Sequence, residues 1–307
     1  MTKPWREFHK LPREVEQGLN PLNDLSGSEW SQASLSVKEY GGYIASKRRA
    51  HGAAFPLSLA KDLIQIFTRA GDTVLDPFVG VGTTADAAQL TGRHAIGFDI
   101  SPEFIRLAQN GIDDSDRTPL DFKASVRVEL FNESCERLRR HVADASVDLV
   151  LTSPPYCNLL NVTTGRFASS TYGRNIYRGK GRILAKPYTS LPEDFGNLDF
   201  PKYSQKIRRL MEALLAVAKP GSYNVWVVRD FRDMENGVPY LNLHSRIVEL
   251  GCAAGWILTD IVIWDQTRQR HLVKLGGQRK RRFYFNIGHS FLVVFRKNLA
   301  EERFRNA

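Results

Sequence analysis

The sequence predicts an α/β fold built on one doubly wound, mostly parallel sheet, and three observations support this. Short apolar runs alternate with helical patterns from about residue 55 to residue 297. The run from Val147 to Leu151 is continuously apolar, as in a parallel strand that is buried on both faces. The first predicted strand leads directly into a glycine-containing turn and a helix. The length of 307 residues suits one large domain with insertions, or two small domains.

The expected helices follow from apolar periodicity and from start and stop signals. Leu59, Leu63 and Ile66 recur at helical spacing. Ser101-Pro102 offers a capping hydroxyl, followed by a proline that suits the first turn of a helix. We expect Lys219-Pro220-Gly221 to end a helix that starts near residue 202. The expected helices are a stretch that follows Phe55-Pro56-Leu57 and includes Phe67, then 85–90, a stretch from 102 onward, 202–218 and 241–253.

The expected strands are short apolar runs between turn residues. They cover residues 73–75, 95–98, 126–131, 147–151, 223–228, 257–264 and 291–295. Residues 1–50 are polar and irregular, and we expect a loosely packed N-terminal arm there. One folded domain is expected over residues 51–297, followed by a tail at 298–307. Two insertions, 157–200 and 266–285, break the alternation, and the first is too long for an ordinary loop.

The positive charge of the chain is concentrated in these two insertions. The net charge is +10. Residues 157–192 hold six lysines and arginines and no acid, and residues 266–283 hold seven and no acid. The remainder of the chain is therefore slightly acidic. This distribution favours a phosphate-binding face and a polyanionic partner.

Cysteine usage and hydropathy indicate an ordinary cytoplasmic protein. Cys135, Cys157 and Cys252 form no Cys-x-x-Cys pair and no metal-ligand spacing, so we expect reduced thiols and no metal site. Residues 1–10 lack the apolar segment of a signal peptide. No run reaches the ~18 apolar residues that span a membrane.

The first motif is the string Asp76-Pro77-Phe78-Val79-Gly80-Val81-Gly82-Thr83-Thr84, between an apolar strand and a helix. Glycines at such a turn let the backbone approach a ligand closely. Asp99 follows Gly80 by 19 residues, at the end of the next strand, where a carboxylate can bind ribose hydroxyls. The third glycine of the nicotinamide fingerprint is missing, and so is the Gly-Lys-Ser/Thr of a phosphate-binding loop. A Gly-x-Gly pair alone fits any strand-to-helix turn, so the prediction of a cofactor site depends on the full string.

The second motif is Thr152-Ser153-Pro154-Pro155-Tyr156, at the carboxyl end of a buried strand. In an open α/β sheet, ligands bind off the carboxyl ends of the strands, so Asp76, Asp99 and Ser153 should share one edge. Two consecutive prolines hold the chain rigid and leave its carbonyls available, and the tyrosine adds a flat ring. By itself this motif also fits a rigid turn that ends a strand. Its position after the first motif favours a functional role.

With both motifs in place, the sequence resembles the amino-methyltransferases that modify DNA at cytosine-N4 or adenine-N6. The resemblance is strong over residues 50–156 and moderate over 200–297, where 288–297 is similar to the family's last strand. It implies S-adenosylmethionine as the cofactor, with residues 51–56 covering its methionine end and Asp99 on the ribose. The implied cofactor-binding residues are Phe55, Pro56, Asp76, Pro77, Phe78, Gly80, Gly82, Thr83, Thr84, Asp99, Ile100 and Ser101.

The chain departs from the family pattern in two respects. In many relatives the Ser-Pro-Pro-Tyr motif precedes the cofactor loop, whereas here the cofactor half comes first, so the order is circularly permuted. The usual position of the target-recognition region therefore does not carry over. The third strand ends in Asn132-Glu133, where relatives often have an aspartate near the adenine.

The resemblance implies that Ser153, Pro154, Pro155 and Tyr156 are the catalytic residues. Ser153 and the Pro154 carbonyl would accept hydrogen bonds from an exocyclic amino group, and Tyr156 would stack on a base flipped out of the duplex. Carbon-5 methylation would need a nucleophilic cysteine, but Cys157 is not part of a Pro-Cys pair. Serine at the first motif position leans toward cytosine-N4, with adenine-N6 as the alternative.

Double-stranded DNA is the expected partner, and a cognate restriction endonuclease is a further candidate. The basic insertions are the expected contacts, through Arg166, Arg174, Arg178, Lys180, Arg182, Arg279, Lys280, Arg281 and Arg282. Either insertion would also fit a solvated loop. One rival is an RNA or protein methyltransferase of the same fold, although a protein substrate would not explain the basic segments. The other rival is an inactive nucleic-acid-binding relative, against which the intact motif argues.

Overall fold

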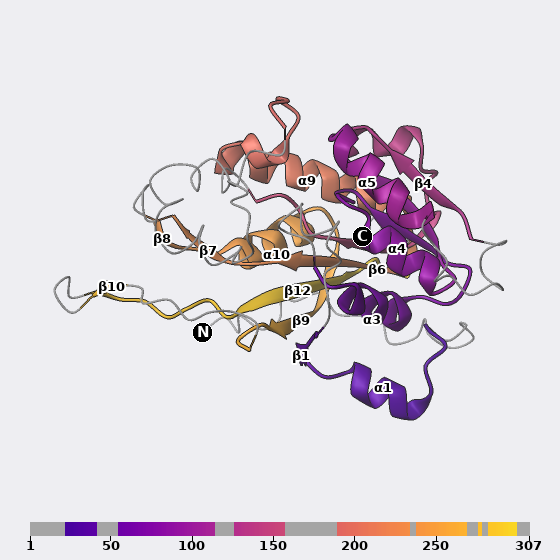
Figure 1. The fold of residues 1–307 in the computed structure, drawn as a ribbon, viewed down its shortest axis with the longest axis horizontal. Helices are drawn as coiled ribbons and strands as arrows, with labels where there is room; N and C mark the ends of the chain where they lie inside the picture. Colours follow the sequence, from indigo (N-terminus) through magenta and orange to yellow (C-terminus); the bar gives the residue numbers. More distant parts are fainter. Residues whose placement is uncertain are drawn as a thin grey trace, which may run out of the picture.

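The apolar runs form one eight-stranded sheet in the computed structural model, shown in Figure 1. The structure describes residues 22–41, 55–113, 126–156, 189–233, 238–268, 276–277 and 282–299. From one edge to the other the strands are β1 (Val37–Glu39), β9 (Ile257–Asp265), β12 (His289–Arg296), β6 (Ala218–Val228), β5 (Val147–Thr152), β2 (Thr73–Asp76), β3 (His94–Phe98) and β4 (Val128–Phe131). Every strand of this sheet except β12 runs in the same direction.

The chain reverses its direction of travel across the sheet between β2 and β5. From β2 it moves outward to β3 and β4, then returns to the other side of β2 as β5 and continues to β6. Strands β4, β3, β2, β5 and β6 therefore lie in the 3-2-1-4-5 order of a doubly wound sheet. The antiparallel strand β12 lies between β6 and β9. Ligands of such sheets bind beyond the carboxyl ends of the strands at the reversal. The predicted fold class is confirmed, and the β2–β5 pair marks where a site should lie.

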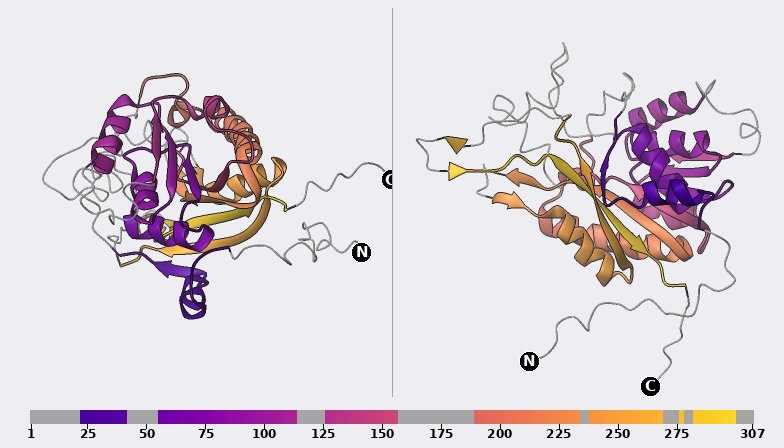
Figure 2. Two further views of the ribbon diagram at one scale, coloured as in Figure 1. Left: turned by 90° about the vertical axis from the view of Figure 1, so that its right-hand side faces the viewer. Right: turned by 90° about the horizontal axis from the view of Figure 1, so that it is seen from below.

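Helices cover both faces of the sheet, as the two views of Figure 2 show. One face carries α3 (Leu57–Phe67), α4 (Thr83–Leu90) and α5 (Pro102–Asp113), whose apolar residues share a cluster with Val74, Leu149 and Leu292. The other face carries α9 (Phe200–Val217), α10 (Leu243–Ala253) and the short helix η2 (Cys135–Arg140). Among the described helices, none has the length and the apolar character needed to cross a membrane.

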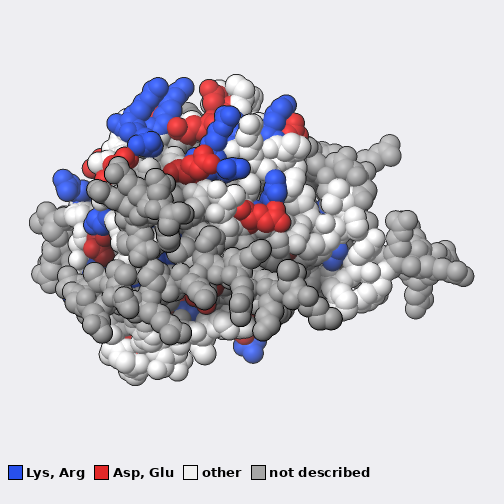
Figure 3. All heavy atoms as spheres, turned by 180° about the vertical axis from the view of Figure 1, so that it is seen from behind, with Lys and Arg blue, Asp and Glu red and all other residues white. Residues whose placement is uncertain are grey.

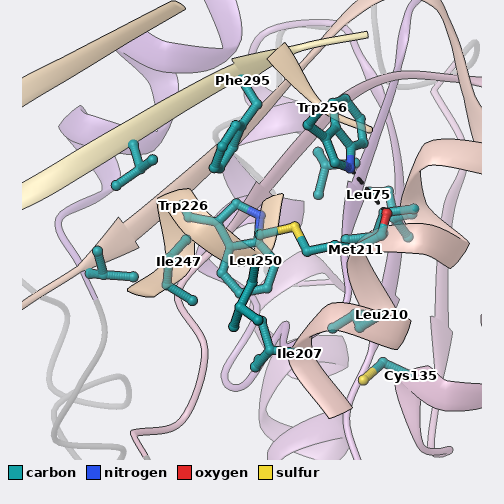
Figure 4. Close-up of a cluster of buried hydrophobic side chains, with 14 of the residues drawn as sticks. Leu75, Cys135, Ile207, Leu210, Met211, Trp226, Ile247, Leu250, Trp256 and Phe295 are labelled. Atoms are coloured by element: carbon teal, nitrogen blue, oxygen red, sulfur yellow. Dashed lines mark hydrogen bonds between the residues drawn. The ribbon is translucent and has the colours of Figure 1, made fainter. Parts of the chain in front are cut away.

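The α9–α10 side of the core is built around two fully buried tryptophans. Trp226 of β6 and Trp256 lie with Met211 of α9 and Phe295 of β12 (Figure 4). The indole N–H of Trp256 donates to the backbone carbonyl of Met211 at 3.0 Å, and that of Trp226 to the Asn224 side chain at 2.7 Å. Both buried donors are therefore satisfied, which avoids the cost of an unpaired polar group. This core fixes β6, whose carboxyl end reaches the site.

The expectation of an irregular arm over residues 1–50 is wrong for part of that stretch. Residues 22–41 include the helix α1 (Gly27–Ala33) and strand β1, which extends the sheet in parallel beside β9. Ser26 and Glu29 form a capping box at the start of α1. The Ser-x-x-Glu spacing was legible in the sequence. No residue of α1 is buried, and β1 has only three residues, so neither has an apolar period to detect.

One further expectation about a strand needs correction, and two hairpins were not expected. Lys219-Pro220-Gly221 does not separate a helix from a strand, because β6 begins at Ala218, directly after α9, and runs through it. Two short hairpins follow in the C-terminal half. They are β7 (Phe231–Asp233) with β8 (Val238–Leu241), and β10 (Gly276–Gly277) with β11 (Arg282–Phe283). Each lies outside the main sheet, so neither shows the long apolar run of a core strand.

Candidate active site

The loop after β2 turns sharply through two glycines in the left-handed region. Gly80 has φ +51° and Gly82, which caps α4, has φ +85°. A side chain at Gly82 would also place its Cβ 2.8 Å from the Cβ of Ala108, so only glycine lets α4 pack on α5 here. Thr83 begins α4 with a buried hydroxyl that has no hydrogen-bond partner among the described residues. An unpaired buried hydroxyl at a helix N-terminus is suited to a polar ligand.

Asp76 ties the two strands of the reversal together. Its carboxylate accepts hydrogen bonds from the hydroxyl of Thr152 at 2.6 Å, the hydroxyl of Thr84 at 2.6 Å and the backbone N–H of Phe78 at 3.0 Å. These partners lie on β5, on α4 and in the loop. Burial raises the pKa of Asp76 to about 6, against the opposing effect of the three hydrogen bonds. The geometry gives Asp76 a bracing role toward the loop and the end of β5.

Asp99 lies just past β3 at the same edge and is partly exposed. One carboxylate oxygen accepts from the backbone N–H of Gly80 at 3.1 Å and the other from that of Ser101 at 2.8 Å. Burial raises its pKa to about 7, and the nearby charges of Asp76 and Asp194 add to the rise. Both oxygens keep acceptor capacity, as binding a pair of ribose hydroxyls requires.

The Ser-Pro-Pro-Tyr motif follows β5 directly, beside this loop. Ser153 and Tyr156 are partly exposed, whereas Pro154 is buried. Burial raises the pKa of Tyr156 to about 12, although hydrogen bonding with the Ser153 side chain and the backbone N–H of Arg229 lowers it. The Tyr156 ring stacks on Phe231, with 6.0 Å between centroids and 12° between planes. The phenol is therefore neutral at physiological pH, and its ring is held in a fixed plane.

The structure adds a segment that sequence reasoning placed inside an insertion. Residues 189–199 return to the site, where Phe195 meets Phe78 of the cofactor loop edge-on at 5.3 Å. Buried Asp194 holds the turn by accepting from the backbone N–H of Gly196 at 2.8 Å and from Thr189. Pro155 lies 3.5 Å from the point where a Gly196 side chain would begin. Most of the predicted insertion, residues 157–188, lies outside the described residues.

A second group that was not predicted lies at the end of β6, directly after Arg229, whose backbone hydrogen-bonds Tyr156. Asp230 is fully buried and accepts from the backbone N–H of His244 at 3.0 Å and the hydroxyl of Tyr240 at 2.8 Å, with His244 Nδ1 at 2.8 Å. Burial raises the pKa of Asp230, but the hydrogen bonds outweigh it and leave the pKa below its usual value. An acid directly after an apolar strand, as at Asp76 and Asp99, was the signal that could have found it.

The remaining predicted residues fall into three groups. Phe55 is buried with Val79 and Leu151, Pro56 caps α3, and the Ser101 hydroxyl caps α5 by accepting from the backbone N–H of Phe104 at 3.3 Å. Pro77 is buried and Ile100 is partly exposed at the same edge. Residues 51–54, Cys157, Arg166, Arg174, Arg178, Lys180, Arg182, Arg279, Lys280 and Arg281 lie outside the described residues, as does the side chain of Arg282 in β11.

Asn132, at the position that departs from the family pattern, takes part in the same edge. Its side-chain N–H donates to the backbone carbonyl of Asp99 at 3.0 Å. Glu133 points elsewhere, toward His141 at 2.6 Å and Arg137 at 3.4 Å. Asn132 therefore supports the backbone at Asp99, whereas Glu133 belongs to a surface ion-pair group.

Figure 3 shows that lysines and arginines on the back of the molecule stand beside acids. Arg139 pairs with Asp144 at 2.9 Å, and Lys206 pairs with Glu136 at 2.6 Å. Mixed charges of this kind do not favour a polyanion. In the sequence, the excess of positive charge lies in the two acid-free segments, 157–192 and 266–283.

The fold is a doubly wound α/β sheet that carries a glycine-containing loop and a second polar motif at the strand reversal. Residues 4–110 match the family model described as DNA methylase, which joins the N6 and N4 types. The chain is 44% identical over 94 residues to the type II methyltransferase M.BglI of Bacillus subtilis, covering 30% of this chain and 26% of that protein. It is 42% identical over 133 residues to M.MthZI of Methanothermobacter thermautotrophicus, covering 43% and 36%.

The chain is therefore similar to DNA methylases of the N6 and N4 types over part of its length, and its motifs predicted this resemblance. The matches span about a quarter to a third of the length of these relatives. Among solved structures, a SAM-dependent methyltransferase from Methanosarcina mazei aligns with a TM-score of 0.45 and 16% identity, over 78% of this chain and 98% of that one. The similarity to DNA methylases supports S-adenosylmethionine as the cofactor.

Proposed function

We propose that the protein is an S-adenosylmethionine-dependent DNA methyltransferase that acts on the exocyclic amino group of a flipped base. One observation carries the proposal: the two motifs meet across the strand reversal. The hydroxyl of Thr152, directly before Ser153, donates to Asp76 at 2.6 Å, so the cofactor loop and the Ser-Pro-Pro-Tyr motif are hydrogen-bonded neighbours. A cofactor bound at the loop and a base bound at the motif would be adjacent, which is what direct transfer requires.

The residues of the loop fit this cofactor. Gly80 and Gly82 open the turn to close approach, and the buried Thr83 hydroxyl has no partner within the described chain. Asp99 would accept hydrogen bonds from the ribose hydroxyls in its ionised form. When bound, S-adenosylmethionine supplies a methyl group that its sulfonium centre already activates, so no covalent enzyme intermediate is needed.

The motif residues act on the amino group. Its lone pair is delocalised into the base ring, which makes it a poor nucleophile. Hydrogen bonds from the amino group to the Ser153 hydroxyl and the Pro154 carbonyl draw the nitrogen toward tetrahedral geometry and free that lone pair. The raised pKa of Tyr156 keeps its phenol neutral, so the ring serves as a stacking surface for the base and not as a proton acceptor.

Cytosine-N4 is the base position that we propose, because serine opens the motif where the adenine-N6 type leans toward aspartate. Double-stranded DNA is the proposed substrate, in the cytoplasm. We propose a restriction endonuclease with the same recognition sequence as the functional partner. Methylation would protect the DNA from cleavage by that endonuclease. The two acid-free basic segments of the sequence support a polyanionic substrate.

The test is to incubate the protein with methyl-labelled S-adenosylmethionine and unmethylated genomic DNA, digest to nucleosides and identify the labelled one. We expect N4-methylcytosine. Label in N6-methyladenine would be consistent with the proposed mechanism but would show that adenine, not cytosine, is the target base. Label in RNA added in parallel, with none in DNA, would overturn the proposed substrate.

A further inference from the structure

Two phenylalanines project from the molecule beside the proposed site. Phe283 and Phe285 are 76% and 77% exposed, more than any other large apolar side chain of the described residues. Their rings meet edge-on, with centroids 5.1 Å apart. A phenylalanine side chain is ordinarily buried in a protein core or in an interface. An exposed pair therefore indicates a surface that binds a partner.

The pair is fixed to the rest of the molecule by Arg232. The Arg232 guanidinium donates to the backbone carbonyls of Pro239 at 2.6 Å and Phe285 at 3.0 Å, and it lies over the rings of Tyr240 and Tyr284 at 5.2 and 5.0 Å. It thereby joins the β7–β8 hairpin to the segment that carries the phenylalanines. In Figure 1 β7, β8 and β10 extend from the same end of the sheet. We call residues 283–285 the aromatic arm.

The aromatic arm is connected to the residues that hold Tyr156. Phe231, which stacks on Tyr156, directly precedes Arg232. The backbone N–H of Arg229 hydrogen-bonds the Tyr156 phenol, and the Arg229 guanidinium donates to the carbonyl of Ile287 at 2.6 Å. One short segment, residues 229–232, therefore touches the base-binding motif on one side and the arm on the other.

The charge of the sequence that leads into the arm indicates the partner of the arm. Residues 266–283 contain seven lysines and arginines and no acid, so the sequence leading into the arm attracts phosphates. The same charge on a second copy would repel it, which disfavours self-association through this surface. Exposed aromatic rings inside a basic segment suit nucleic acid, whose bases offer flat faces for stacking.

We propose that Phe283 and Phe285 enter the DNA stack beside the target base and hold open the space that the base leaves. The inference rests on the proposed function, because a base must leave the duplex to reach Ser153. Apolar wedges of this kind compensate for unstacking by contact with the neighbouring bases. The arm lowers the cost of extrusion, and it makes no contact with the reacting atoms.

The experiment compares F283A/F285A with the wild-type protein on two duplexes that contain the methylation site, mapped beforehand from DNA methylated by the wild type. In one duplex the target base is paired, and in the other it faces an abasic residue, so that extrusion is already easier. We expect kcat/KM of the double variant to fall roughly 10-fold or more on the paired duplex and by much less on the abasic one. W30A, which removes an exposed ring from α1, is the matched control and should behave as wild type.

Three results would overturn the proposal. Equal losses on the two duplexes would show that the rings serve general binding, and no loss on either would show that they do not meet DNA. A change of oligomeric state in the double variant, measured by light scattering, would assign the surface to a second copy. Because both side chains are exposed, the variant should keep the wild-type melting temperature. If the wild type methylates no DNA, the proposed function itself fails, which is a distinct outcome.

Discussion

Asp99 and Tyr156 lie on opposite sides of the strand reversal and are held in different ways. Asp99 is fixed by backbone N–H groups of Gly80 and Ser101, which belong to its own β2–α4–β3 unit. Tyr156 rests on Phe231 and Arg229, which lie at the end of another strand far along the chain. The cofactor side is thus locally determined, whereas the base side depends on long-range packing. Substitutions on the two sides should therefore separate cofactor binding from turnover.

The largest effect is expected on the base side, from S153A. Loss of the hydroxyl removes an acceptor that the amino group uses as it becomes nucleophilic, so kcat should fall about 100-fold or more. The dissociation constant of S-adenosylmethionine, measured by calorimetry, should stay within about 2-fold. A parallel loss of cofactor affinity would mean that the two sides are not separable.

D99N is expected to have the opposite effect and to weaken cofactor binding. The amide cannot accept charge-assisted hydrogen bonds from the ribose, so cofactor affinity should weaken roughly 10- to 100-fold. Since the pKa of Asp99 lies at about 7, wild-type affinity should rise as the pH increases through neutrality and the carboxylate ionises. D99N should lose that rise. Calorimetry at several pH values is the measurement, and a pH dependence that survives in D99N would assign it to another group.

A smaller effect is expected from D230N, because Asp230 is a positioning residue that acts through the segment holding Tyr156. Its carboxylate accepts from His244 and Tyr240, and the amide retains only part of that acceptor capacity. We expect kcat to fall about 10-fold, whereas the KM for DNA and the affinity for the cofactor should remain unchanged. Y240F, which removes a single donor, should lose less. A KM effect with unchanged kcat would remove Asp230 from this role.

The smallest effect concerns stability. The pKa values of Asp76 and Asp99, about 6 and about 7, lie above the ordinary value of 3.8. The folded protein therefore holds these two protons more tightly than the unfolded chain does. The stability that this tighter binding contributes is fully present below about pH 4 and is lost as the pH rises through 6 to 7. Without cofactor, D99N should have a higher melting temperature than the wild type at pH 8. The difference in melting temperature should be smaller at pH 5. Scanning calorimetry checks the difference, and an equal gain at both pH values would contradict it.

The same contrast explains what could be predicted from the sequence. The loop from Asp76 to Thr84, Asp99 and the Ser-Pro-Pro-Tyr motif are local strings at strand ends. The alternation of apolar runs predicted where the main strands lie along the chain. Asp230 and Phe195 came from no motif, because their roles depend on which strands become neighbours. Strand β1 and the two short hairpins were missed because a two- to four-residue strand outside the core carries no periodic signal. The basic residues proposed to bind DNA stay predictions.

The most direct test of the central claim follows label from S-adenosylmethionine into duplex DNA with three proteins: wild type, S153A and D99N. We expect label in DNA with wild type and almost none with S153A at any cofactor concentration. With D99N we expect label that recovers when the cofactor concentration is raised. If S153A methylates DNA as fast as the wild type, the Ser-Pro-Pro-Tyr motif is not the site of transfer, and the proposed meeting of cofactor and base at the strand reversal is wrong.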